Sequence, residues 1–82
     1  MSKADEMFEK LGYIKIKEHK FEEPYNEEVT ELILYRDEVK RTEIEFWNDK
    51  TISKSCGFDM SYITMQELQA INEKCKELGW IE

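Results

Sequence analysis

The chain has 82 residues, and its 19 acidic residues outnumber 12 basic ones, which gives a formal net charge of −7. A chain of this length is typical of one domain, so residues 1–82 are expected to form a single unit, because smaller pieces would not bury a core. The negative charge disfavours duplex DNA as a ligand, since an acidic surface repels a polyanion.

Signals for export or membrane insertion are not found in the sequence. No apolar run approaches the ~20 residues of a membrane span, and none resembles the apolar part of a signal peptide. The two cysteines, Cys56 and Cys75, are too few for a disulfide framework or a zinc knuckle. We therefore expect a reduced, cytoplasmic protein that makes no contact with a membrane.

A short amphipathic helix is predicted over residues 2–11. Ser2 stands three residues before Asp5, the spacing of a helix N-terminal cap. The apolar stripe of this helix consists of Ala4, Met7, Phe8 and Leu11. Gly12 is the expected stop, because a residue without a Cβ enters the left-handed conformation at little cost.

The middle of the chain predicts a β-sheet. Alternation of apolar and polar residues indicates strands at about 13–20, 30–36, 42–47 and 51–56, because side chains on a strand point alternately to its two faces. One face is predicted to carry Ile14, Ile16, Leu32, Leu34, Ile44, Phe46, Ile52 and Cys56. The other face is predicted to carry Tyr13, Lys15, Lys17, Ile33, Tyr35, Glu43, Glu45 and Trp47.

The turn between the last two strands can be chosen by its register. A two-residue loop would place Phe46 opposite Thr51 and turn Ile52 to the wrong face. A three-residue loop over residues 48–50 pairs Phe46 with Ile52 and keeps the apolar face intact. We therefore predict the three-residue loop.

A second amphipathic helix is predicted over residues 65–78. Thr64 and Glu67 have the spacing of a capping box, and Ile63 and Leu68 that of a hydrophobic staple. The predicted apolar stripe is Met65, Leu68, Ile71, Cys75 and Leu78. As at the first helix, a glycine and an aromatic residue follow, and we expect the aromatic side chain to pack back on the last turn.

Together the elements predict an α+β fold of order α-β-β-β-β-α. The strands are expected to form a four-stranded antiparallel meander with one apolar face. Both helices must bury their stripes, and the simplest arrangement packs both on that same face of the sheet. The opposite face of the sheet would then be open to solvent.

No catalytic motif is evident. The chain has only three glycines, which do not cluster into a phosphate-binding loop. Cys56 and His19 are the cysteine–histidine pair on the predicted sheet, but their side chains are predicted to point to opposite faces. A nucleophile and its base must be in contact, so this pair does not predict an enzyme.

Metal-binding and paired-carboxylate sites are also weakly indicated. His19 with Glu22 and Glu23 falls short of the three or four ordered ligands of a zinc site. Glu43 and Glu45 would project side by side, as glycosidase carboxylates do, yet alternating glutamates are more typical of a solvated strand face. We expect no catalysis, no cofactor and no metal.

Two features point to a protein partner. The predicted open face combines aromatic and apolar side chains with acids, and aromatic residues are enriched in interfaces. The segment 22–31 is acidic and would suit a basic partner. The candidate interface is Tyr13, Ile33, Tyr35, Trp47, Glu43, Glu45, Glu27, Glu28 and Glu31. Alternatively, the acidic segment is only solvated, and Trp47 packs across a neighbouring strand or under the loop at residues 21–29.

The segments ADEMFEKLGY (4–13) and ITMQELQAINEKCKELGW (63–80) resemble small uncharacterised proteins encoded by phages, prophages and mobile elements of Gram-positive bacteria. The resemblance covers roughly a third of the chain. It implies a bacterial cytosol and an accessory role, and it transfers no site residue.

The sequence thus predicts a small non-enzymatic accessory protein that binds another protein. A structural homodimer without a separate ligand is one alternative. An acidic inhibitor that imitates the charge of DNA and binds a nucleic-acid enzyme is another.

Overall fold

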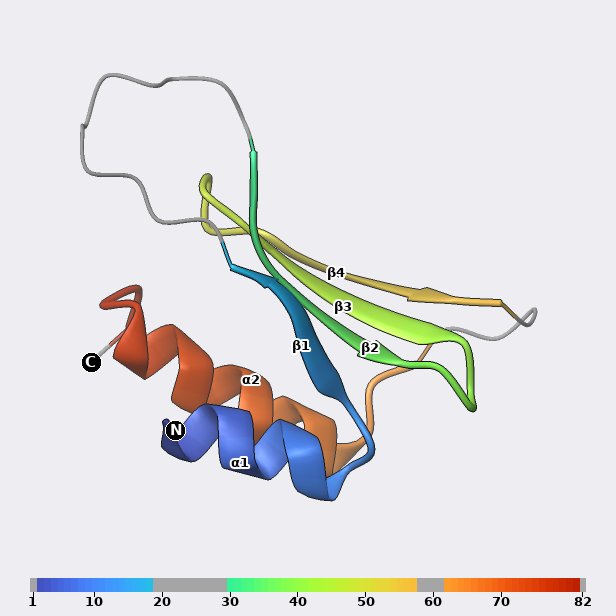
Figure 1. Cartoon of the computed structure of the whole chain (residues 1–82). Coiled ribbons are helices and arrows are strands. Elements are labelled where there is room, and N and C mark those ends of the chain that lie inside the picture. Colours follow the sequence, from blue (N-terminus) through green and yellow to red (C-terminus); the bar gives the residue numbers. More distant parts are fainter. Residues whose placement is uncertain (1, 19–29, 58–61, 82) are drawn as a thin grey trace.

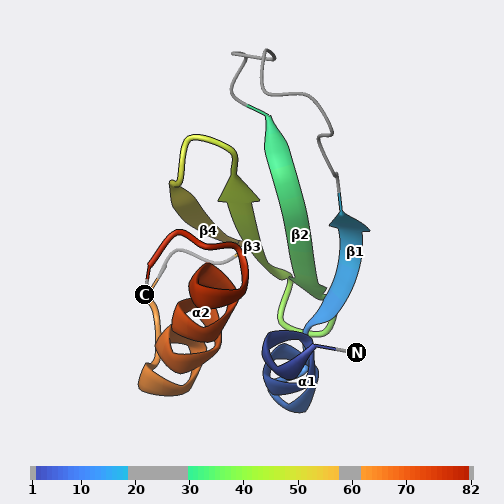
Figure 2. The same ribbon diagram turned by 90° about the vertical axis from the view of Figure 1, so that its left-hand side faces the viewer.

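The computed structural model describes residues 2–18, 30–57 and 62–81. Its elements are α1 (Lys3–Lys10), β1 (Ile14–Glu18), β2 (Glu31–Asp37), β3 (Thr42–Trp47), β4 (Ile52–Cys56) and α2 (Met65–Glu77). The strands form one antiparallel sheet in the order β1-β2-β3-β4. Figures 1 and 2 show α1 and α2 side by side on one face of this sheet. The predicted α+β meander with both helices on one face is confirmed.

The helix ends follow the predicted signals. Ser2 caps α1, and Thr64 and Glu67 form the reciprocal capping box of α2, with bonds of 3.1 and 2.9 Å. Gly12 and Gly79 follow the two helices with φ of +100° and +76°, the left-handed conformation that glycine adopts readily. No helix in the described ranges is long and apolar enough to cross a membrane.

The predicted register of the last hairpin is confirmed. Phe46 pairs with Ile52 across β3 and β4, and residues 48–50 form the loop. Lys50 has a positive φ of 67°, as the last residue of a three-residue hairpin loop commonly does. In the preceding hairpin, the Asp37 carboxylate accepts hydrogen bonds from two backbone N–H groups of the turn.

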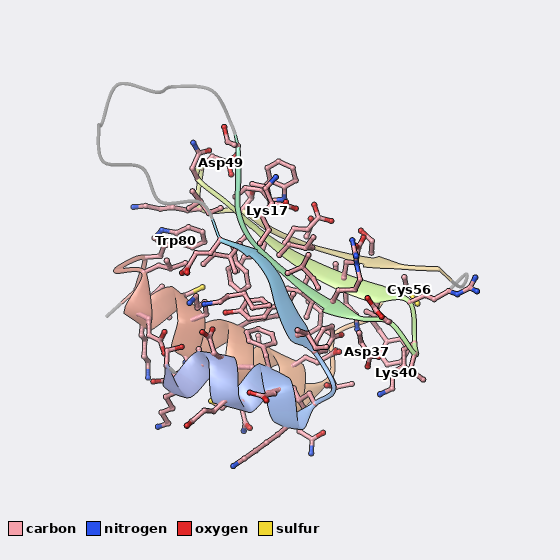
Figure 3. All side chains as sticks on the ribbon, in the orientation of Figure 1. Lys17, Asp37, Lys40, Asp49, Cys56 and Trp80 are labelled. Carbon is pink, nitrogen blue, oxygen red and sulfur yellow. The ribbon has the colours of Figure 1, made fainter. Side chains whose placement is uncertain are left out.

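Aromatic rings form the centre of the core between the sheet and the helices. The Phe8 ring of α1 stacks on Tyr35 with centroids 4.0 Å apart and meets the edges of Tyr13 and Phe46. Trp80, which follows Gly79, was predicted to pack on the last turn of the helix; its ring instead packs against Phe46 of β3, with ring centroids 6.2 Å apart. Figure 3 shows Trp80 on the side of the sheet that faces α2. The buried cluster is Phe8, Tyr13, Ile33, Tyr35, Ile44, Phe46, Ala70, Ile71 and Cys75.

The predicted orientation of β1 and β2 is wrong. Tyr13, Ile33 and Tyr35 are at most 3% exposed and pack against the helices, so they do not belong to an open face. Ile14 and Ile16, which were predicted to point inward, are about half exposed. Leu34 was also predicted to face the helices, but it lies on the opposite face.

The reversal has a physical reason. β2 carries apolar side chains on both faces, so an alternating pattern does not select the inner one. The two tyrosines decide the orientation, because their hydroxyl groups reach carboxylates on the helices: Tyr13 reaches Glu67, and Tyr35 reaches Asp5. Register shifts in both strands, next to Lys15 in β1 and Glu31 in β2, further change which residues share a face.

The inner face of α2 also differs from the predicted stripe. Ile71 and Cys75 are buried as predicted, but Met65 is 69% and Leu68 46% exposed. Ile63, the predicted staple partner of Leu68, is half exposed as well. The buried residues of α2 are Glu67, Ala70, Ile71, Lys74 and Cys75. The helix is therefore rotated so that two charged side chains point inward.

Candidate functional site

The face of the sheet opposite the helices, here the open face, holds what remains of the predicted interface. Ile44 and Phe46 of β3 point to the helices. The residues that alternate with them, Glu43, Glu45 and Trp47, therefore point away. Residues that pair directly across strands share a face. By this register the open face comprises Ile14, Lys17, Glu31, Leu34, Arg36, Glu43, Glu45, Trp47, Ser53 and Ser55.

Trp47 lies across β3 and β4 on this face. Its indole Nε1 donates a hydrogen bond of 3.2 Å to Ser53 Oγ, and Ser53 is the cross-strand partner of Glu45. The ring is thus held on Ser53, on the same face of the sheet as Glu45, and keeps part of its surface exposed. Trp47 thus packs across a neighbouring strand, as one of the two alternatives predicted, but it is not buried.

The carboxylates of the open face differ in how far cations balance them. Glu43 forms an ion pair with Arg36 at 2.7 Å, and Glu31 lies 3.9 Å from Lys17. Glu45 forms no ion pair within the part of the chain that the structure describes; it accepts a hydrogen bond of 3.3 Å from Ser55 and lies within hydrogen-bonding reach of the Glu31 carboxyl. Partial burial, together with the nearby charge of Glu31, raises the pKa of Glu45. Its negative charge is therefore uncompensated.

The remaining sequence candidates divide into two groups. Glu27 and Glu28, with most of the acidic segment 22–31, lie outside the described residues, as do His19, Glu22 and Glu23. Glu31 is described and lies on the open face opposite Trp47. The structure thus brings together Trp47, Glu43, Glu45 and Glu31, and it separates them from the buried Tyr13, Ile33 and Tyr35.

A charged network that the sequence did not reveal lies on the helix side of the sheet. Asp5 of α1 accepts a hydrogen bond of 2.5 Å from Tyr35, and its carboxylate is 2.9 Å from Lys15 and 3.5 Å from Lys74. Burial alone would raise the pKa of Asp5, but the bonds from Tyr35 and Lys15 and the charge of Lys74 outweigh it and lower the pKa to about 2. Asp5 therefore links α1 to β1, β2 and α2.

A second network is centred on Glu67 of α2. Its carboxylate accepts from the Tyr13 hydroxyl at 2.6 Å, from Lys54 at 2.8 Å and from the backbone N–H of Thr64 at 2.9 Å. Burial opposes ionisation, but these three donors lower the pKa of Glu67. Burial and the bond to Glu67 raise the pKa of Tyr13. Glu67, which takes part in the capping box of α2, thus also joins the helix to the sheet.

These networks join elements of the fold. A cleft of about 470 Å³ lies over the first network and is lined by Asp5, Glu9, Tyr13, Ile14, Lys15 and Tyr35. Its Asp5, Lys15 and Tyr35 groups are bonded to one another. Burial raises the pKa of the Cys75 thiol, which favours its unreactive protonated form. Among the described residues, no three potential ligands gather into a metal-binding group.

Comparisons with known proteins place the chain in no group: no family model, no curated protein and no solved structure matches it. The resemblance of its terminal segments to phage-encoded proteins stays a prediction.

Proposed function

We propose that this chain is a small, non-enzymatic protein-binding module that docks a basic surface of its partner on the open face. The observation that carries this proposal is that the Glu45 carboxylate, which no cation of the described residues pairs with, shares the open face with the partly exposed Trp47 ring. The accessory role in a phage or mobile element, and the bacterial cytosol as its setting, rest on the resemblance of the terminal segments.

The chemistry of this pair favours a lysine or arginine from the partner. Such a cation stacks on an indole with a gain of about 0.5–2 kcal/mol and gains further from a nearby carboxylate. It would also relieve the repulsion between Glu45 and Glu31 that contributes to the raised pKa of Glu45. Binding of a cation therefore lowers that pKa, and affinity should weaken as the pH falls and Glu45 becomes protonated.

The mixed charge of the open face favours an ordinary protein interface over a surface that imitates DNA. Lys17 and Arg36 alternate with the glutamates there, whereas a DNA mimic needs a surface of one sign. Oppositely charged neighbours instead set the register of a protein interface. The described part of the chain thus supports an ordinary protein-binding face.

The test is capture from a lysate of the bacterial host, with and without phage induction. The immobilised baits are the unmodified chain, Trp47→Ala, Glu45→Gln and the control Val39→Ala, since Val39 is 92% exposed in the turn between β2 and β3. Circular dichroism and urea unfolding confirm that each bait is folded.

The unmodified chain and Val39→Ala should capture the same basic protein. Its affinity, measured by calorimetry after purification, should fall at least tenfold with Trp47→Ala or Glu45→Gln and should decline with added salt. Capture of nothing, or equal binding by all four baits, would refute the proposal.

A further inference from the structure

The outer side of the first turns of α2 is apolar and faces solvent. Tyr62 is 63% and Ile63 50% exposed just before the helix, and Met65 and Leu68 are exposed within it. Met65 and Leu68 are three residues apart, so they lie on one side of the helix. These four exposed side chains are here called the α2 patch; clustered exposed apolar side chains are commonly functional.

The α2 patch carries little outward charge, since the Lys54 ammonium, 5.3 Å from the Tyr62 ring centroid, is paired with Glu67 at 2.8 Å. Residues 62–72 contain one charged residue, Glu67, although 38% of the whole chain is charged. The Glu67 side chain is directed inward to Tyr13 and Lys54. Depletion of charge with aromatic residues and methionine is the composition of an interface core. This inward rotation of Glu67 is what leaves the outer surface neutral.

The polar residues around the patch fit a second copy of the chain. Gln66, Gln69 and Asn72 are all exposed on α2, and each is an amide that both donates and accepts hydrogen bonds. Across a two-fold axis such side chains can pair with their own counterparts. A rim of carboxylates or ammonium groups would instead meet like charges, since a two-fold interface places the same surface on both subunits.

The edge of the sheet at β1 suits self-association less well than the α2 patch. With a net charge of −7, two copies repel each other unless they meet through a neutral surface. The edge strand β1 carries Lys15 and Lys17 and a register shift between them, the devices by which natural sheets avoid edge pairing. We infer that the α2 patch is the interface between two copies of this chain, with the two α2 helices packed antiparallel around Met65 and Leu68.

The size of the α2 patch sets the expected affinity of the dimer. Stable dimers bury about 800 Å² per partner, and the α2 patch is smaller, so the dimer should be weak, with a Kd of about 10–100 µM. Added salt should strengthen it, because screening reduces the repulsion between two acidic chains. This salt dependence is opposite to that expected for a basic partner on the open face, and neither proposal depends on the other.

Sedimentation velocity of the full chain under reducing conditions tests the inference. Samples from 5 µM to 1 mM, in low and high salt, should show a monomer–dimer equilibrium that shifts to dimer with salt. Leu68→Lys should weaken association at least tenfold, because the two-fold axis places both new charges in the interface. Val39→Lys, which adds the same charge at an exposed apolar site remote in sequence, should leave association unchanged.

Two results would overturn the inference. One is a strict monomer at every concentration and salt, even if another protein is later found on the α2 patch. The other is a dimer that Leu68→Lys does not weaken, since its interface would then lie elsewhere. Urea unfolding of Leu68→Lys should match that of the unmodified chain, because Leu68 is exposed in the monomer.

Discussion

Replacing Asp5 by asparagine removes the charge through which α1 holds β1 and α2. The Asp5 carboxylate is 2.9 Å from Lys15 and 3.5 Å from Lys74. Asparagine can still accept the hydrogen bond from Tyr35, but it forms no ion pair. Among the described residues, Lys74, which is 4% exposed, would then be left with the ion pair to Glu77, at 3.7 Å. The change should therefore destabilise the fold at neutral pH.

The size of the effect follows from the pKa of Asp5. Folding lowers it from 3.8 to about 2, and each tenfold change in an ionisation equilibrium is worth about 1.4 kcal/mol. Because the side chain is only 11% exposed, solvent screens this effect little. Ionised Asp5 thus contributes about 2 kcal/mol to the free energy of unfolding. The folded pKa lies below the unfolded one, so this contribution is present above about pH 5 and is lost as the pH falls through about 2.

Urea unfolding at pH 7, 5, 3 and 2 measures this directly. Asp5→Asn should be about 2 kcal/mol less stable than the unmodified chain at pH 7, and the difference should shrink to a few tenths by pH 2. Glu9→Gln, on an exposed position of the same helix, is the control and should show no such pH dependence. A difference between Asp5→Asn and the unmodified chain that stays constant with pH would refute the reasoning.

Three further substitutions test other contacts. Tyr13→Phe removes one donor to Glu67 and should cost about 1–2 kcal/mol in urea unfolding; NMR titration should show a higher Glu67 pKa, and an unchanged value would contradict the bond. Gly12→Ala should cost more than Gly79→Ala, because its added Cβ would lie 2.9 Å from Asp37 Oδ2, whereas nothing lies within 4 Å at Gly79. Strain at positive φ alone costs both about 1 kcal/mol, so equal losses in thermal or urea unfolding would argue against the clash.

The positions of the elements could be predicted from the sequence because their signals are local. The capping box of Thr64 and Glu67, the glycine stops and the pairing of Phe46 with Ile52 each depend on residues close together in the chain. Such signals act through backbone geometry and turn length, which a short segment determines by itself.

The orientation of the elements could not be predicted in the same way. Tyr13 and Glu67 are 54 residues apart, and Tyr35 and Asp5 are 30 apart, so no local pattern shows that they meet. The apolar stripe predicted for α2 put Met65 on the side that faces the sheet. The buried side instead has the same helical spacing but consists of Glu67, Ala70, Ile71, Lys74 and Cys75. Charged residues in such a stripe, with small Ala70 among them, are the signal that could have indicated a buried network.

For the same reason, the sequence predicted only part of the candidate site correctly. Trp47, Glu43 and Glu45 alternate with strongly apolar Ile44 and Phe46, so the pattern of β3 assigns its faces without ambiguity. β2 is apolar on both faces, and its inner side is chosen by partners on the helices. Of the described candidates, Trp47 and the three glutamates therefore lie on the open face, whereas the two tyrosines and Ile33 are buried.

The most direct test of this arrangement follows the ionisation of Tyr13 and Tyr35. Burial, together with the hydrogen bonds to Glu67 and Asp5, raises the pKa of both phenols. In an NMR titration of ring-labelled tyrosine, both Cζ signals should remain those of the protonated phenol at pH 11 while circular dichroism shows a folded chain. A signal from either residue that moves with a midpoint near the ordinary value of about 10 would show that its side chain is exposed to solvent. The open face and the inner side of the sheet would then be wrongly assigned.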